Sequence, residues 1–444
     1  FRFYRHRVSL HIVHIKHCIV FITQSYDVEK VGFFCPWKER FKERISQFTL
    51  RTAYDASALF HSMHPGKNPE KSNLMIQSKV GTHTRGKDDP IYRYDTPFAK
   101  DLLKSVRAEM KTTSWFAPAF FWIRLSIIAL GTLFVEYQFA TTGLTFWGIF
   151  VGLFHAQIGL SVQHDASHGS LSKNSFYNAL FSYGADWIGN SRYIWFQQHI
   201  LWHHPHTNHP SLDPDASSAE PFLFFKDYSK KRHPVAPKSS WFPSKYQNYI
   251  THFILSLYGP SVVFNPYVYT LKHNEHVSSS LVRVYFSKRR LVSVMLRLFY
   301  FLRVTLLPYL SGASLLSSIF LVNIVCGINL TFLFVISHNF EGSDRDPTRI
   351  SSEDKQDVEI DWYKSQAETS CTYGGVTAMM LTGGLNMQIE HHLFPRLNSW
   401  HYPRIREAIQ KCCQRHGVKY KYYPSVLSNT LSMLRYMRRV GVLH

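Results

Sequence analysis

The chain alternates between long apolar runs and polar segments, and the apolar runs come in two close pairs. One pair covers residues 115–139 and 141–162, and the other covers 291–310 and 313–337. Each run approaches or exceeds the roughly 20 residues with which a helix crosses a bilayer. Because almost no linker separates the members of a pair, the pattern predicts four transmembrane helices in two hairpins.

Some positions oppose this interpretation. Arg124, Arg297 and Arg303 fall inside the runs, and charge at membrane depth is costly. The alternative is a soluble protein with buried helices. A fifth apolar run, 249–268, is broken by polar residues and prolines, so we expect it to lie in the membrane interface rather than to cross.

Composition supports a membrane protein. Of the 444 residues, 45% are hydrophobic and 16% aromatic, and the formal charge is +20. The basic residues are scattered and often flank apolar runs, which favours an anionic membrane surface on the cytosolic side over nucleic acid. None of the six cysteines forms a CxxC pair, which favours a reducing compartment.

Three histidine clusters carry the candidate chemistry. They read HDASH at 164–168, HILWHH at 199–204 and QIEHH at 388–392. On a helix, residues three or four apart share one face, so each cluster aims ring nitrogens at one point. Neutral imidazole binds iron, copper, zinc and nickel. Seven such histidines exceed what one structural zinc needs and indicate two adjacent metal ions.

The predicted topology is consistent with a shared site. An even number of crossings separates the three clusters, so all of them lie on one side of the membrane. Since the basic segments lie there too, we expect that side to be cytosolic.

The order HxxxH, HxxxHH and QxxHH resembles the membrane fatty-acid desaturases. The Gln of the third cluster is similar to that of the front-end desaturases, which act between an existing double bond and the carboxyl end. Further blocks match, namely TNHP at 207–210, DPD at 213–215, SHNFE at 337–341, TYGG at 372–375 and GGLN at 383–386. The resemblance is strongest to delta-5 enzymes of algae and protists that act on C20 polyunsaturated chains. Close relatives usually carry HxxHH in the second cluster, so the extra residue between His199 and His203 is a departure.

The resemblance implies a desaturase domain at 97–425 and a set of site residues. Two iron ions would be held by eight histidines: His164, His168, His199, His203, His204, His338, His391 and His392. We expect Gln388 and Asn339 as candidate catalytic residues beside the metal. Asp165, Glu390, Asp213 and Asp215 are candidates to accept hydrogen bonds from ligand rings. Asn386, Trp195 and Tyr373 could line the acyl tunnel or simply pack.

A second, partial resemblance covers residues 1–86. DASALFHSMH at 55–64 is similar to the later half of a cytochrome b5 domain, in which His64 would be an axial haem ligand. The HPGG motif of the first ligand is absent where it would be expected, at 41–44. The region is therefore interpreted as a degenerate, small α+β cytochrome b5-like domain, with or without haem b.

Together these patterns predict a mainly α integral membrane protein of the endoplasmic reticulum with a cytosolic, histidine-rich di-iron cap. The resemblance implies an O2-dependent desaturase that acts on an acyl-lipid or acyl-CoA and receives electrons from cytochrome b5 and its reductase. The alternatives are a delta-4, delta-6 or sphingoid delta-8 desaturase, a hydroxylase, an inactive paralogue, or a membrane metal-binding protein.

Overall fold

A computed structural model describes the chain over most of its length. The described residues are 11–15, 18–22, 24–26, 57–65, 79–82, 91–209, 213–216, 219, 222–225, 244–260, 263, 290–343 and 359–442.

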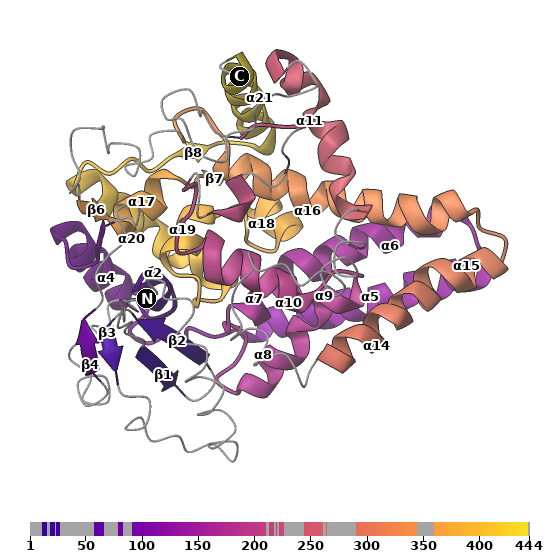
Figure 1. Ribbon diagram of the computed structural model, residues 1–444, viewed down its shortest axis with the longest axis horizontal. Helices are drawn as coiled ribbons and strands as arrows, with labels where there is room; N and C mark the ends of the chain where they lie inside the picture. The colour runs from indigo at the N-terminus through magenta and orange to yellow at the C-terminus, as the bar shows by residue number, and fades with distance from the viewer. Residues whose placement is uncertain are drawn as a thin grey trace, which may run out of the picture.

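Four long apolar helices form a bundle that extends to one side of the molecule (Figure 1). Their bounds as candidate membrane spans are Ala119–Thr142, Thr145–Ser167, Leu291–Leu310 and Leu316–His338. The prediction of four spans in two hairpins is confirmed, but the predicted bounds were too early for the first pair. The second span continues through the first histidine cluster instead of ending before it.

The spans are built from α-helical and π-helical pieces. In chain order they are α5 (Ala119–Thr142); α6 (Thr145–Gln157), η2 (Ile158–Gln163) and α7 (His164–Ser167); α14 (Arg290–Phe301), η6 (Leu302–Leu306) and α15 (Leu307–Leu310); and η7 (Leu316–Leu321) and α16 (Val322–His338). The two hairpin turns meet, because Ser311 Oγ donates to the Ala140 carbonyl at 2.7 Å. Gly143 adopts φ 65° there, and a Cβ on it would lie 2.4 Å from the Ser311 oxygen.

Small residues let α6 and α16 approach closely. A Cβ on Gly152 would lie 2.7 Å from Val325 Cβ and 2.8 Å from the Val322 oxygen. Such close helix contact is typical of membrane bundles. The outward face of α5 is apolar and exposed, with Leu130 67% and Ile127 63% exposed, as expected of a lipid-facing surface.

The charges within the spans have protein partners. Arg124 donates to Ser161 Oγ (2.5 Å), Gln157 Oε1 (2.7 Å) and the Met380 carbonyl (2.7 Å). Arg303 of η6 forms an ion pair with Glu136 of α5. Arg124 thus has neutral hydrogen-bond acceptors and Arg303 has a carboxylate partner inside the protein, which answers the objection that the sequence raised at these two positions.

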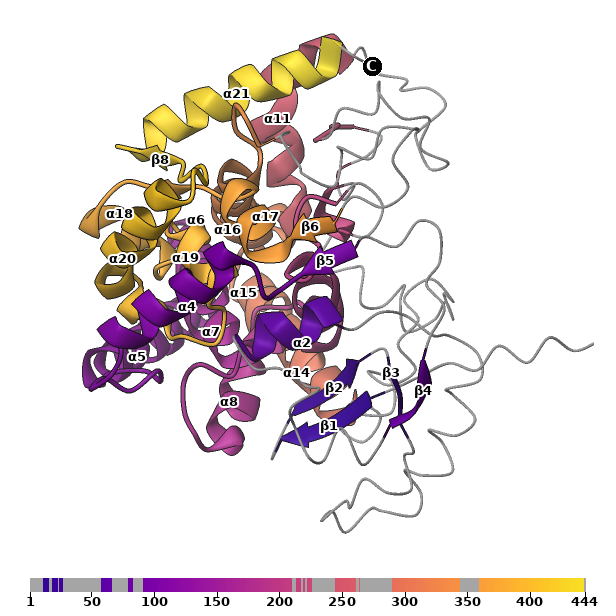
Figure 2. The ribbon, with the colours of Figure 1, turned by 90° about the vertical axis from the view of Figure 1, so that its left-hand side faces the viewer.

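Shorter elements cap one end of the bundle, which faces the viewer in Figure 2. They include α4 (Pro97–Glu109), α8 (Ser175–Ser182), α9 (Gly184–Trp187), α10 (Arg192–Trp195), η3 (Phe196–His203), η4 (Pro214–Ala216), η5 (Ser244–Tyr246), α11 (Gln247–Ser256), α17 (Trp362–Glu368), α18 (Val376–Thr382), α19 (Gln388–Leu393), η9 (Ser399–His401), α20 (Tyr402–Arg415) and α21 (Val426–Val442). Parallel pairs join β5 (Ile91–Arg93) to β6 (Glu359–Asp361) and β7 (Thr372–Tyr373) to β8 (Tyr422–Tyr423).

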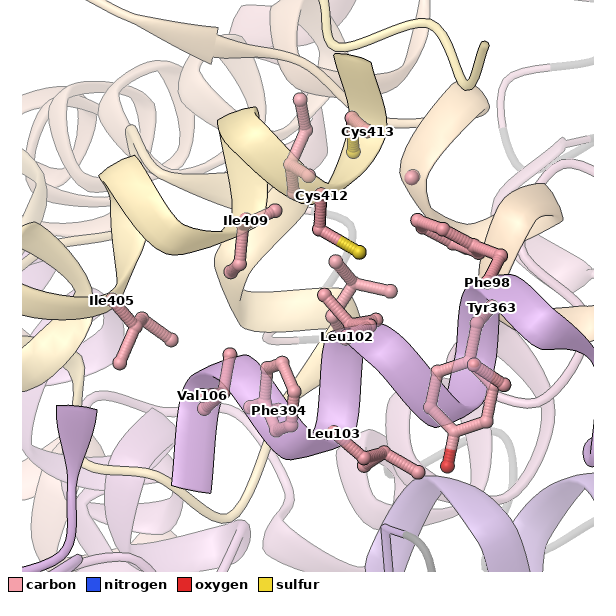
Figure 3. Close-up of a cluster of buried hydrophobic side chains, with 14 of the residues drawn as sticks. Phe98, Leu102, Leu103, Val106, Tyr363, Phe394, Ile405, Ile409, Cys412 and Cys413 are labelled. Atoms are coloured by element: carbon pink, nitrogen blue, oxygen red, sulfur yellow. The ribbon is translucent and has the colours of Figure 1, made fainter. Parts of the chain in front are cut away.

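An apolar core holds the cap together. Phe98, Leu102 and Val106 of α4 point toward Ile409 and Cys412 of α20 (Figure 3). The spacing of four along α4 places its apolar residues on one face. Proline at the first position and the Thr96 side chain, which accepts from the Ala99 amide at 3.1 Å, define where α4 begins.

The described N-terminal elements are two antiparallel strand pairs and one helix. They are β1 (His11–Ile15) with β2 (Cys18–Ile22), β3 (Gln24–Tyr26) with β4 (Lys79–Thr82), and α2 (Ser57–Met63). Leu59 and Met63 of α2 pack against Ile200 of η3. Residues 41–44, where the first haem ligand would be expected, lie outside the described residues, so the cytochrome b5-like domain stays a prediction.

The fifth apolar run is described only in part. Its helix α11 packs along α16, and Thr331 Oγ1 donates to the Leu255 carbonyl. Tyr249 and Phe253 on its outer face are 74% and 64% exposed. An interfacial position for α11 stays a prediction that this exposed apolar face supports.

Candidate metal centre

The eight histidines predicted as ligands lie in one buried cluster at the cap end of the bundle. In one group of four, each ring offers a nitrogen within 4.8 Å of the others: His164, His168, His199 and His391. A group of three does the same: His203, His338 and His392. The eighth, His204, lies between the groups, with its ring 4.5 Å from that of His168 and 4.4 Å from that of His392.

π-Helical turns position two of the clusters. The segment η2 leads directly into His164, and η3 carries His199 and His203. The His204 amide donates to the His199 carbonyl five residues earlier at 3.1 Å, and the Nε2 atoms of these two residues are 3.1 Å apart. A π turn holds one residue more than an α turn and occurs frequently at functional sites. It therefore accommodates the extra residue that makes this cluster HxxxHH.

Hydrogen bonds at Nδ1 orient several rings. Nδ1 of His203 lies 3.1 Å from both carboxylate oxygens of Asp213, and Nδ1 of His164 lies 3.2 Å from Asp165 Oδ1. Nδ1 of His338 donates to the Thr369 carbonyl at 3.2 Å. A ring whose Nδ1 donates to such an acceptor leaves Nε2 without a proton and ready to bind a metal ion.

Further partners come from residues that the sequence did not suggest as acceptors for ligand rings. Nδ1 of His392 lies 3.1 Å from Gln366 Oε1 and 3.0 Å from Thr207 Oγ1, and Nδ1 of His391 lies 2.9 Å from Tyr402 Oη. Thr207 belongs to the TNHP block, but nothing in the sequence links Gln366 or Tyr402 to the histidines. These two become visible only when the fold brings α17 and α20 to the site.

The positions of the remaining ring nitrogens fit metal ions. The Nε2 atoms of His338 and His392 lie 3.2 Å apart. Because Nδ1 of each ring has a hydrogen-bond acceptor, Nε2 carries no proton, and the two Nε2 lone pairs point toward each other. Among the described residues, His164 Nε2, His391 Nε2 and both nitrogens of His168 are buried without a hydrogen-bond partner. Two ligands about 2.1 Å from one ion are separated by about 3–3.4 Å, so the Nε2 pairs have the spacing of ligand pairs.

Burial favours the neutral form of five of the rings. It lowers the pKa of His168, His199, His204, His391 and His392 well below the usual value, and the neighbouring imidazoles lower it further. A neutral imidazole is the form that binds metal. The nitrogen-rich set suits iron, so the residues present fit two iron ions.

Other predicted site residues have different surroundings. Gln388 begins α19 and is buried; its amide donates to the Leu385 carbonyl at 2.9 Å. Asn339 follows α16 and donates to the Val335 carbonyl at 3.1 Å. Glu390, a candidate partner of a ligand ring, instead accepts from Thr372 Oγ1 at 2.8 Å and from Tyr420 Oη. That candidate was wrong, because the carboxylate of Glu390 joins α19 to the strands around β7 and β8.

Aromatic side chains surround the histidines. The Trp195 ring lies 4.3 Å from the His199 ring and 5.5 Å from that of His164. Phe334 of α16 lies 5.9 Å from His199. Asn386, by contrast, donates to the Tyr373 carbonyl at 2.7 Å, so these two residues stabilise the chain around β7.

His64 is buried at the end of α2, next to the contact between α2 and η3. Since its expected haem partner falls outside the described residues, the haem role of His64 stays a prediction.

A family model for fatty acid desaturases matches residues 139–424, which include all eight histidines. The chain belongs to the fatty acid desaturase family. It is therefore an oxidoreductase that acts on acyl chains at a membrane.

The desaturase is 33% identical over 405 residues to an acyl-lipid (7-3)-desaturase of Rebecca salina, covering 87% of this chain and 83% of that one. A second acyl-lipid (7-3)-desaturase, from Diacronema lutheri, is 32% identical over 341 residues, which are 74% of this chain and 72% of the relative. The Delta(5) fatty acid desaturase A of Dictyostelium discoideum is 24% identical over 423 residues, with coverages of 88% and 85%.

Proposed function

We propose that this desaturase is a front-end enzyme that inserts a cis double bond into a polyunsaturated acyl chain, at the delta-5 position of a C20 substrate. The convergence of the QxxHH cluster with the other histidines in one buried centre carries this proposal. The delta-5 name of one relative supports the position.

A different position is the second candidate. Relatives with the higher identities carry the label (7-3) rather than delta-5. Position depends on how deeply the acyl chain enters the site, which the histidine clusters do not determine. A test of the position therefore needs acyl substrates of several chain lengths.

We infer that the eight histidines hold two iron ions, which when bound would supply the activation of O2 that side chains cannot provide. Asp165, Asp213 and Thr369 hold the rings in the orientation and tautomer that present Nε2. Trp195 and Phe334 offer apolar surface for a methylene chain and exclude water.

We propose Gln388 and Asn339 as further polar groups of the site. Gln388 Oε1 and Asn339 Oδ1 are buried, and neither has a hydrogen-bond partner within the described ranges. Each could accept a hydrogen bond from a water molecule or a substrate group, because a buried acceptor without a partner is costly.

We propose that the electrons come from cytochrome b5 and its reductase, and that the centre faces the cytosol at the endoplasmic reticulum. The excess of lysine and arginine over acidic residues, which gives a formal net charge of +20, supports a cytosolic cap. One relative, from Chlamydomonas reinhardtii, is named chloroplastic, so a plastid membrane is the alternative location. Fluorescence microscopy of the tagged chain in its own cells distinguishes the two.

The test is fatty-acid profiling of yeast that expresses the full chain and is fed C18, C20 or C22 polyunsaturated acids. A new delta-5 product from the C20 feed alone is expected, and none from a His391→Ala variant present at the same level. A product from C22 alone would replace delta-5 with the second candidate. If no feed gives product even with co-expressed cytochrome b5, the chain is an inactive paralogue.

A further inference from the structure

A charged network lies inside the membrane bundle, away from the histidine cluster. Glu136 of α5, His155 of α6 and Arg303 of η6 are all buried. His155 Nε2 lies 2.7 Å from Glu136 Oε1, and Arg303 forms an ion pair with the same carboxylate. Ionisable residues at membrane depth are rare and usually have a function.

The network also binds a residue that belongs to no span. Trp187, the last residue of α9, donates from Nε1 to Glu136 Oε1 at 3.2 Å. Arg303 donates from Nη2 to the Trp187 carbonyl at 2.8 Å, and its guanidinium carbon lies 3.9 Å from the centre of the Trp187 ring. One ion pair therefore fastens α9 to the first and third spans.

Two neighbouring contacts fasten the same segment to the third span. Ser293 Oγ donates to the Asp186 carboxylate. Gly189 adopts φ 86°, and a Cβ on it would lie 2.8 Å from the Tyr300 ring. The chain on either side of Trp187 is thus held against the same membrane helix.

On its other side, this segment contacts both histidine-bearing elements. A Cβ on Gly184 would lie 2.9 Å from Ile158 Cγ2, so α9 packs on η2, which leads into His164. The Arg192 amide donates to Asp186 Oδ2 at 3.3 Å at the start of α10, which ends with Trp195 against His199. We call residues 184–195 the wedge segment.

Stability alone does not account for the ion pair. Apolar residues of similar volume usually replace a buried pair without loss of stability, whereas a pair can specify one arrangement. We propose that the Glu136–Arg303 pair positions the wedge segment and thereby fixes the first and second histidine clusters relative to each other. Glu136 and Arg303 are positioning residues; the consequence for desaturation rests on the proposed function.

The test uses the full chain in detergent and the double variant Glu136→Gln/Arg303→Met. Removing both charges together leaves neither member of the pair without its partner, so the variant is expected to fold. Amide hydrogen exchange in the wedge segment should become about tenfold faster, while exchange in α4 and α20 stays the same. Iron bound per chain and product formed in yeast should each fall about tenfold at equal protein level.

The matched control is Glu407→Gln/Lys411→Met, which removes an exposed ion pair of 2.6 Å on α20. It should change none of these measurements. If the double variant does not accumulate, Trp187→Phe removes the Nε1 donor and part of the ring but keeps an aromatic face for Arg303, and it should speed exchange in the wedge segment to a smaller extent.

Unchanged exchange in the wedge segment would overturn the proposal, whatever happens to activity. Faster exchange with unchanged iron content would also overturn it, since the clusters would then not depend on the segment. A parent chain that makes no product contradicts the proposed function instead, and exchange and iron content still decide the role of the pair.

Discussion

At the scale of single residues, the centre depends on nitrogen atoms that carry no proton. Acceptors at Nδ1 and the lowered pKa values act in the same direction, because both leave Nε2 with a free lone pair. In the absence of a metal ion, the facing pair of His338 and His392 repels. Binding a cation there relieves that repulsion, so the site is organised for metal before metal arrives.

We predict that Asp213→Asn weakens iron binding by about 10–100-fold, because the His203 ring loses a charged acceptor. Asp213 also accepts from the Asn208 amide at 2.7 Å, so the loop should keep its shape in part. The measurement is the chelator concentration that removes half of the iron. Asp95→Asn, at a carboxylate 73% exposed, serves as control, and equal midpoints for all three proteins would contradict the prediction.

The sequence identified the histidines but not the groups that orient them. His164, His391 and their neighbours could be found because ligand spacing repeats within each short cluster. Gln366 and Thr369 could not, since each is a single polar residue whose role depends on a contact across the fold. The prediction for Glu390 failed because Glu390 and His391 are adjacent in sequence and therefore point to different sides of α19. The Glu390 carboxylate accepts from Thr372 instead.

At the scale of elements, π-helical turns and close helix packing determine the geometry. The apolar pattern predicted the four spans because the length and apolar composition of a run are enough to identify a helix that can cross a bilayer. It placed the end of the second span too early, because His164 and Asp165 are polar yet continue the helix in a buried environment. Nothing in the HxxxHH spacing alone distinguished an α turn from the π turn of η3.

We predict that Gly152→Ala destabilises the bundle by about 1–3 kcal/mol, because the added Cβ meets the α16 backbone and Val325. Gly148→Ala should cost less, since its Cβ would lie 3.2 Å from the Phe139 ring and 3.6 Å from Val322 Cγ2 and would meet no backbone atom of α16 that closely. Thermal unfolding in detergent measures both. Equal midpoints for the two variants would show that α6 and α16 are not packed so closely.

At the scale of the whole molecule, the buried histidines make stability depend on pH. Burial lowers the pKa of five of them well below 6.5, so they stay neutral in the folded chain while they become protonated in the unfolded one. Below about pH 6.5 the unfolded state therefore binds more protons, and the free energy of unfolding falls as pH decreases.

Accordingly, the thermal midpoint of the metal-free protein should be constant from about pH 8 to pH 7 and fall below about pH 6.5. The decline should be shallower in His391→Ala/His392→Ala, which removes two of the five groups. A thermal midpoint that is the same below about pH 6.5 as it is at pH 8 would mean that the rings are not neutral in the folded chain.

The orientation of the bundle gives a further prediction. Leu144, 58% exposed, lies at the turn of the first hairpin, and Arg438 is exposed on α21 at the cap. In sealed microsomes, a membrane-impermeant maleimide should label Arg438→Cys but not Leu144→Cys; detergent should expose both. Cys326, Cys371, Cys412 and Cys413 of the parent are buried, so these four cysteines give little background. The reverse pattern would place the centre in the lumen.

The contact between Asp165 and Asn398 joins positions that are 233 residues apart. Ribosomes synthesise the first two histidine clusters, which end at residue 204, long before the third, which begins at residue 388, so the nascent chain carries an incomplete site while the residues between them are added. Imidazoles in such a half-built site prefer copper to iron. If the centre holds the two iron ions proposed above, cells that make this chain have to deliver iron after synthesis is complete, or shield the unfinished histidines from copper and zinc until the last cluster is made.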